Sequence, residues 1–327
     1  MDHQNSTEMA EPAFKKFDIV SDHSDHYYST VKKHGKGKNN NGDGHSFING
    51  STVYKNIMRE WKILEKNLPD TIYVRAYETR VDLMRAVIIG AADTPYQDGL
   101  FFFDIKFPPD YPDHPPHVYY RSHGLSLNPN LGSNGYICLS LLNTWIGWRS
   151  ERWHLSRSTI LQVLVSIQGL VLNERPYYNE AGLGFFDRNI LRHLTEYRYK
   201  TYNAKAFVLT CQSTLYLLKN PPKNFESFIA EHFRQRASGI LRASGLLEGY
   251  YVTMRLRFSN GSSQYNSMEL LYPELVEAFR KNGWVEEDLQ VVEESSTQLA
   301  DQVERKAKLP FSWLFCCLPW LSWAASN

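Results

Sequence analysis

Four apolar, strand-like runs follow one another along the chain with no helix-like segment between them. They read TIYVRAYE, LMRAVIIGA, LFFFDIKF and HVYYRS, at residues 71–78, 83–91, 100–107 and 117–122. Turns marked by Asp, Gly and Pro separate these runs. Because no helix lies between them, the order predicts a four-stranded antiparallel meander in an α+β domain, not a parallel sheet. The Pro-rich stretch FPPDYPDHPP, before the last run, predicts a rigid extended loop.

Apolar residues at helical spacing predict helices on both sides of this meander. The helix before it presents Val53, Ile57, Trp61 and Leu64. The helix after it presents Ile160, Leu164, Ile167 and Val171. From residue 186 to about 247 the pattern is again helical, with one break at Pro221-Pro222.

Composition divides the 327 residues into four parts. Residues 1–50 are polar and contain the tract VKKHGKGKNNNGDGH, which predicts a disordered tail. Residues 51–248 form the folded core, and residues 249–308 form an extension that includes the strand-like run YYVTMRLRF. Residues 309–327 are a hydrophobic tail. The net charge of +1 gives no global field that favours nucleic acid.

No metal site or disulfide scaffold is expected. The polar tail contains His23, His26, His34 and His45, whose positions do not repeat a ligand spacing. The cysteines are Cys138, Cys211, Cys316 and Cys317, with no Cys-x-x-Cys pair, and the N-terminus has no apolar signal-peptide core. We therefore expect reduced thiols and a cytoplasmic location.

Cys138 lies between Ile137 and Leu139, and an Asn- and Gly-rich loop precedes it. In such a setting a free cysteine is usually a small buried hydrophobe. A nucleophilic role needs no dedicated base when the substrate is already a thioester, because a thiolate then displaces a thiolate. Asn130, eight residues before Cys138, is a candidate donor for the oxyanion.

The order of these motifs closely resembles the ubiquitin-conjugating enzymes (E2). The family signature is His-Pro-Asn, then eight residues from that Asn to the active-site cysteine, and this chain has Asn128-Pro129-Asn130 before Cys138-Leu139. The segments LLNTWIGWRSERW, PYYNEAG and PPKNFESFIAEHF resemble a subgroup of large E2s. This subgroup includes E2/E3 hybrid enzymes and plant E2s linked to phosphate homeostasis.

The resemblance implies an E2 fold and an acyltransferase mechanism. Cys138 would accept ubiquitin from an activating enzyme (E1) as a thioester and pass it to a substrate lysine, with Asn130 supporting the loop and the oxyanion. No cofactor is implied, because E1 consumes the ATP. Asn179 and Glu180 fall where other E2s place groups that orient the incoming lysine. Asn128 replaces the motif histidine, which leaves the rigidity of the loop open.

Partner surfaces follow from the same resemblance. Lys55, Arg59 and Lys62 lie on the first helix, which E2s use to dock E1, although a solvated helix would have the same residues. An E3 ligase is a further expected partner. The insertion with Trp145, Trp148 and Trp153 either shapes the access of the acceptor or covers the core.

The C-terminal run LPFSWLFCCLPWLSW is fifteen residues long, or roughly 22 Å as a helix, against the roughly 30 Å of a bilayer core. Its aromatic residues and the Cys316-Cys317 pair fit an interfacial membrane contact with S-acylation. Packing of the tail on the E2 domain or on a dimer partner is the alternative.

The sequence leaves other functions open. A non-catalytic E2-like scaffold that binds ubiquitin or ligases would retain most of these motifs. A conjugator of a ubiquitin-like modifier would differ only in its E1. A thiol hydrolase is disfavoured, because no clear base accompanies Cys138.

Overall fold

The computed structural model describes residues 14–30, 47, 50–145, 147–180, 192–257 and 266–285. Its strands are β1 Phe17–Val20, β2 Ile72–Tyr77, β3 Leu83–Ile89, β4 Leu100–Lys106 and β5 His117–Tyr120. Its α-helices are α1 Tyr27–Thr30, α2 Thr52–Asn67, α3 Ile160–Ser166, α5 Arg192–Lys219, α6 Glu226–Arg257 and α7 Asn266–Lys281. Short helical turns lie at η1 Ser140–Leu142, η2 Ile167–Val171 and η3 Pro176–Asn179.

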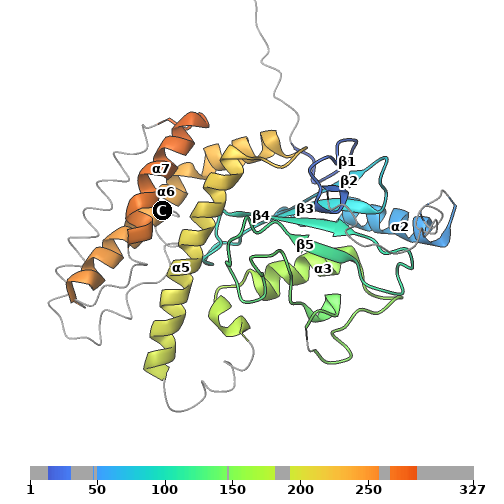
Figure 1. The fold of residues 1–327 in the computed structure, drawn as a ribbon, viewed down its shortest axis with the longest axis horizontal. Helices are drawn as coiled ribbons and strands as arrows, with labels where there is room; N and C mark the ends of the chain where they lie inside the picture. Colours follow the sequence, from blue (N-terminus) through green and yellow to red (C-terminus); the bar gives the residue numbers. More distant parts are fainter. Residues whose placement is uncertain are drawn as a thin grey trace, which may run out of the picture.

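The strands form one sheet in the order β1-β2-β3-β4-β5 (Figure 1). Strands β2 to β5 pair antiparallel with their neighbours, which confirms the predicted meander. The sequence analysis did not predict β1, which adds a parallel strand at the β2 edge.

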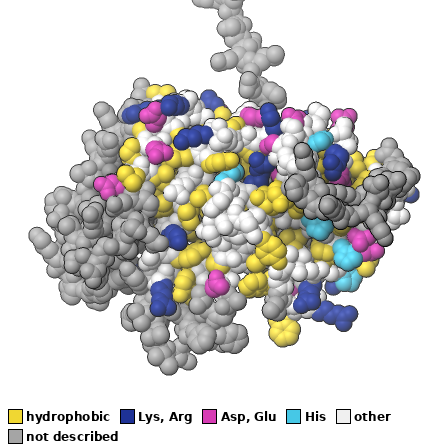
Figure 2. Space-filling view, in the orientation of Figure 1, with side chains coloured by type: hydrophobic (Ala, Val, Ile, Leu, Met, Phe, Trp, Pro, Cys, Tyr) yellow, Lys and Arg dark blue, Asp and Glu magenta, His cyan; other side chains and the backbone are white. Residues whose placement is uncertain are grey.

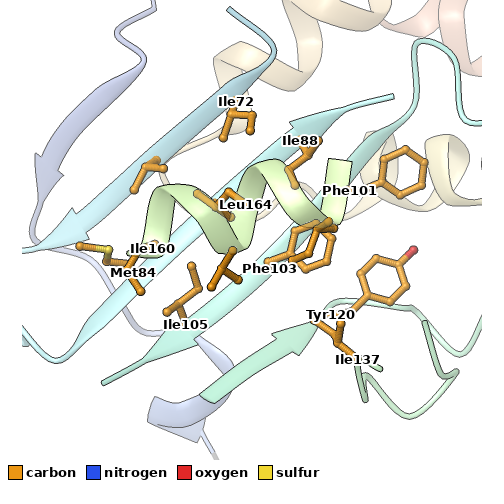
Figure 3. Close-up of a cluster of buried hydrophobic side chains, with 14 of the residues drawn as sticks. Ile72, Met84, Ile88, Phe101, Phe103, Ile105, Tyr120, Ile137, Ile160 and Leu164 are labelled. Carbon is orange, nitrogen blue, oxygen red and sulfur yellow. The ribbon is translucent and has the colours of Figure 1, made fainter. Parts of the chain in front are cut away.

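Helices α2 and α3 cover one face of the sheet. Alternate strand residues such as Ala86 and Phe103 point to this face, as the period of two along a strand requires. Figure 3 shows α3 lying across the strands, with Ile160 and Leu164 among the sheet residues. Ile137, one residue before Cys138, belongs to the same buried cluster, so the core of the domain anchors the cysteine loop.

Glu60 joins three parts of this layer from inside the core. The residue lies on α2 and is 6% exposed. Its Oε1 accepts a hydrogen bond from the Tyr111 hydroxyl at 2.8 Å, and its Oε2 accepts one from the Ile160 amide at 2.9 Å. Burial raises the pKa of the Glu60 carboxyl. The side chain therefore links α2 to the Pro-rich loop and to the first turn of α3.

Helices α5, α6 and α7 pack together and cover part of the opposite face, where Val87 and Phe102 point (Figure 1). Helix α5 ends at Lys219 and α6 begins at Glu226, which confirms the predicted break at Pro221-Pro222. Among the described residues, no helix is both long and apolar enough to cross a membrane.

The prediction of a disordered tail over residues 1–50 is wrong for residues 14–30. Strand β1 lies in this segment and pairs with β2. Asp25, a few residues later, forms an ion pair with Arg85 of β3 at 2.8 Å. The segment is polar in sequence, but its polar groups find partners on the sheet, so it does not need a large apolar surface to be ordered.

A fully buried carboxylate holds this N-terminal segment in place. Asp104 on β4 accepts hydrogen bonds from Arg85 Nε at 2.6 Å and from the Tyr27 amide at 2.8 Å. His26 is also fully buried beside it and contacts the Met84 carbonyl at 2.9 Å. Burial by itself would raise the pKa of Asp104, but the Arg85 guanidinium holds that pKa below its usual value.

The predicted boundary at residue 248 is also wrong, because α6 runs through it to Arg257. Residues 250–257 of the strand-like run YYVTMRLRF continue this helix instead of starting a strand. Adding residues to an existing helix needs no new nucleus, so the preceding turns override a local strand preference. Helix α7, in the predicted extension, packs against α5 and α6.

Some predictions fall outside the described residues. They concern His34 and His45, the charged segment after residue 285, and the hydrophobic tail 309–327 with Cys316 and Cys317.

Candidate active site

Cys138 is half-buried, whereas its neighbours Ile137 and Leu139 are buried. The loop before it folds back on itself, so that the Cys138 amide donates to the Asn130 carbonyl at 2.9 Å. The Asn130 side-chain Nδ2 in turn donates to the Cys138 carbonyl at 2.8 Å. The two residues are thus linked by a reciprocal pair of hydrogen bonds, and two buried apolar side chains hold the backbone on either side of the thiol.

A turn at Gly135 brings the ends of this loop together. Gly135 has a φ of 87°, in the region that glycine adopts most readily, and a Cβ at this position would overlap the Tyr119 ring. Its carbonyl accepts a hydrogen bond from the Tyr120 amide at 2.9 Å. The loop is therefore joined directly to strand β5.

Asn128, at the position of the motif histidine, is the best-connected residue of the loop. It is 1% exposed, and its Nδ2 donates to the Tyr96 hydroxyl at 2.9 Å and to the Val171 carbonyl at 2.7 Å. Its Oδ1 accepts from the Asn130 amide at 2.8 Å. The question left open by the missing histidine is answered, because an asparagine at this position ties the loop to its surroundings.

Asn179 belongs to the same network. Its Nδ2 donates to the Val171 carbonyl at 3.0 Å and lies 3.4 Å from Asn128 Oδ1. Its Oδ1 accepts from Asn173 Nδ2 at 2.8 Å. Both ends of this amide are occupied within the protein, so its contacts here support the loop.

Glu180 is exposed, and its negative charge acts on the Cys138 thiol. Burial raises the pKa of Cys138, and the carboxylate of Glu180 raises it further. The thiol consequently has a smaller thiolate fraction at neutral pH than a free cysteine. Such a cysteine is a weak nucleophile toward ordinary carbonyl compounds and depends on an activated substrate.

The chain after Cys138 is fastened to it through Thr144. Thr144 Oγ1 accepts from the Leu139 amide at 3.0 Å and donates to the Leu139 carbonyl at 3.1 Å. Two of the following tryptophans differ in burial. Trp153 packs against the core and donates to the Pro112 carbonyl at 2.7 Å, whereas Trp148 is 80% exposed and covers no core.

Lys55, Arg59 and Lys62 are all exposed on α2. Among the described residues, none of them forms a hydrogen bond or ion pair with the cysteine loop, and Arg59 donates to Asn56 at 3.0 Å. They form a basic surface separate from the thiol, and a plain solvated helix has the same appearance.

The sequence analysis missed three members of the site. Tyr96, Thr144 and Val171 hold the loop, but their partners are a buried amide and backbone groups that no sequence spacing identifies.

Comparison with known proteins places the chain in a family. The family model described as ubiquitin-conjugating enzyme matches residues 56–206. Putative ubiquitin-conjugating enzyme E2 39 of Arabidopsis thaliana is 46% identical over 241 residues, which are 70% of this chain and 68% of that protein. Probable ubiquitin-conjugating enzyme E2 24 of Arabidopsis thaliana is 46% identical over 277 residues, or 83% of this chain.

Other relatives are much longer than this chain. The match spans only 29% of E2 24. Human dual E2 ubiquitin-conjugating enzyme/E3 ubiquitin-protein ligase BIRC6 is 35% identical over 237 residues, which are 67% of this chain and 5% of that protein. The cysteine loop, the meander and these likenesses agree: this chain belongs to the ubiquitin-conjugating enzyme (E2) family.

Proposed function

We propose that this chain carries ubiquitin as a thioester on Cys138 and transfers it to substrate lysines. In the first step the Cys138 thiolate attacks the carbonyl carbon of the E1–ubiquitin thioester, a new C–S bond forms, and the E1 thiolate leaves. In the second step a lysine amine attacks the same carbon and forms the isopeptide bond. The Cys138 thiolate leaves, and the amine loses its proton to solvent.

The observation that carries this proposal is the half-buried thiol on a loop held by buried groups. The first step exchanges one thioester for another and the second converts the thioester into an amide, so both steps need access and a positioned carbonyl more than a strong base. The raised pKa of Cys138 fits this division of labour, because the activation of ubiquitin is done beforehand by E1.

Asn130 is proposed as support for the oxyanion as well as for the loop. One N–H of its amide donates to the Cys138 carbonyl, which holds the side chain against the backbone of the cysteine. Loss of a donor of this kind costs about 3 kcal/mol of barrier in other acyl-transfer sites.

Glu180 is proposed to orient the incoming lysine. Its negative charge raises the pKa of the Cys138 thiol, and the same charge would attract a lysine ammonium that approaches Cys138. Asn179 is assigned an indirect part, because its amide is already bonded to Asn173 and Val171. It positions the loop beside which the lysine must arrive.

The expected partners are ubiquitin, E1, substrate proteins and an E3 ligase. The exposed bases Lys55, Arg59 and Lys62 are proposed as the E1-docking surface. An E2/E3 hybrid role is proposed from the likeness to BIRC6, whose name states both activities. A cytoplasmic location, with membrane contact through residues 309–327, remains a prediction.

The test is an incubation with E1, ubiquitin and ATP, followed by a gel without reducing agent. The wild-type chain is expected to form an adduct that a thiol reagent removes. Cys138→Ala should form none, and Cys138→Ser should form an ester that survives the reagent. Cys211→Ala is the matched control, because Cys211 is 1% exposed and should not affect charging.

An adduct that persists in Cys138→Ala would refute the assignment of the carrier. No adduct with ubiquitin, but one with a ubiquitin-like modifier and its own E1, would reassign the modifier. No adduct in either case, from a folded sample, would favour the non-catalytic scaffold.

A further inference from the structure

Exposed aromatic and basic side chains lie on both sides of Cys138 in the chain. Trp148 is 80% exposed and Tyr136 is 51% exposed. Arg149 and Arg152 are exposed as well. Large aromatic side chains and arginines are the residue types enriched where proteins bind other proteins.

This surface is connected to the cysteine by short hydrogen-bonded links. The Tyr136 hydroxyl donates to the Thr144 carbonyl at 3.2 Å, and Thr144 is bonded to both backbone groups of Leu139. In the sequence, Tyr136 lies two residues before Cys138, and Leu139 directly follows it. Tyr136 and the segment that carries Trp148 are therefore held near Cys138, where an acceptor protein can contact them.

The backbone under Trp148 is also held. A Cβ added at Gly147 would overlap the Ser140 side chain, so the two segments are in close contact at this point. The Trp148 amide donates to Glu151 Oε2 at 3.1 Å, and the Glu151 amide donates to the Trp148 carbonyl at 2.9 Å. Arg152 Nε donates to the Gly147 carbonyl at 3.3 Å. The indole is thus presented on an ordered turn.

Two arginines, Arg149 and Arg152, and one exposed carboxylate, that of Glu151, lie on this surface, so positive charge is in excess. The carboxylate of Glu151 accepts a hydrogen bond from the Trp148 amide. Within the described part of the chain, no carboxylate lies in ion-pair distance of Arg149, Arg152 or Arg157. Positive and negative side chains are interspersed over the face of the molecule shown in Figure 2. Unpaired arginines beside an exposed indole are complementary to an acidic segment that also carries an apolar side chain.

We propose that Tyr136, Trp148, Arg149 and Arg152 form an acceptor-docking surface. It binds an acidic segment of the substrate protein, next to the lysine to be modified, with an aliphatic side chain of that segment packed on Trp148. The inference rests on the proposed function, because it names the substrate class of the same site. It assigns a part of acceptor selection to this chain itself, through residues close to the thiol.

The test first measures binding without any chemistry. The probe is a fluorescent acidic peptide with a leucine and several glutamates before one lysine. The comparison peptide has glutamines in place of the glutamates. Binding is measured by fluorescence polarisation with the full chain that carries no ubiquitin thioester. The acidic peptide should bind about tenfold more tightly than the glutamine peptide, and added salt should weaken its binding. Trp148→Ala and the double variant R149E/R152E should each weaken it about tenfold or more.

Matched controls lie on the helical part of the molecule. Leu270 is 71% exposed on α7, and Arg242 is exposed on α6. Leu270→Ala and Arg242→Glu remove the same kinds of group from other surfaces and should leave peptide binding unchanged. Circular dichroism of every variant shows whether it is folded.

The second measurement follows discharge from the charged protein. The discharge rate onto the acidic peptide, divided by that onto free lysine, should fall about tenfold in Trp148→Ala, since free lysine is too small to reach the indole. Absence of a thioester in the wild-type chain would refute the proposed function. The peptide-binding measurement would still show whether the docking surface exists.

Three results would overturn the acceptor-docking surface. One is equal binding of the acidic and glutamine peptides by wild type. Another is unchanged binding of the acidic peptide in Trp148→Ala and R149E/R152E. The third is binding of a single-stranded oligonucleotide of equal charge as tightly as the acidic peptide, which would indicate a nucleic-acid surface or a general attraction for anions.

Discussion

Replacement of Asn128 by alanine tests the link between the fold and the cysteine loop. The substitution removes the hydrogen bonds to Tyr96, Val171 and Asn130. The Tyr96 hydroxyl would keep its bond to the Leu127 carbonyl, and the Val171 carbonyl would keep the amide of Asn179. For these two partners the loss is about 1 kcal/mol each.

The third bond costs more, because the Asn130 amide would lose its acceptor. An amide left unpaired in a protein costs about 1–3 kcal/mol. The sum is about 4 kcal/mol, or less in so far as water reaches Asn130, which is only half-buried. Against a total stability of about 5–15 kcal/mol, this change is large but leaves a folded protein.

Urea unfolding followed by tryptophan fluorescence measures the stability. We expect the free energy of unfolding of Asn128→Ala to fall by about 3–4 kcal/mol, with an unchanged slope against urea. Thioester formation should be slower under conditions where the variant is folded, because Asn130 and Cys138 lose a fixed backbone. Asn134→Ala is the control, since Asn134 is an exposed asparagine of the same loop whose side chain accepts a hydrogen bond from the Tyr136 amide.

The control should stay within about 1 kcal/mol of wild type. A loss below about 1 kcal/mol in Asn128→Ala would refute the reasoning, because it would show that the buried network contributes little. If a strongly destabilised Asn128→Ala variant still formed the thioester at the wild-type rate, the network would stabilise the fold without positioning the thiol.

Two further predictions concern charged groups. Asp104→Ala removes one ion partner of the buried Arg85 and leaves it the partly exposed Asp25. The free energy of unfolding, measured by urea titration, should therefore fall by about 3–5 kcal/mol. A change under about 1 kcal/mol would contradict the stabilising role given to the Arg85–Asp104 pair. Glu180→Gln removes one of the two causes that raise the pKa of Cys138, so the rate of Cys138 alkylation by iodoacetamide should rise at lower pH than in wild type. Superimposable pH profiles would show that the Glu180 charge does not act on the thiol.

The meander and the helices around it were predictable because their signals are local. Alternating residues of β3 such as Ala86 and Val87 face opposite layers, and the strand period of two records this in the sequence itself. The amphipathic pattern of α2, with Ile57, Trp61 and Leu64 buried, is equally local. The spacing from Asn130 to Cys138 is a short-range signal of the same kind, and it led to the family.

The N-terminal strand and the support of the cysteine loop could not be predicted in this way. Asp25 and Arg85 are 60 positions apart, and Asn128 reaches Val171 across 43. Nothing in the residues beside Asn128 shows that its amide will meet that carbonyl. Which buried donor meets which acceptor depends on how the sheet and helices pack.

The sequence by itself determined the antiparallel meander, the helices on either side of it and the spacing from Asn130 to Cys138, because these are local patterns of periodicity and spacing. Only the tertiary structure decided that residues 14–30 add a strand to the sheet, that Asn128 ties the cysteine loop to Val171, and that the Glu180 charge acts on Cys138. The physical reason is that burial, hydrogen bonding and electrostatic fields depend on distances in space, and these arise only once remote segments are packed together.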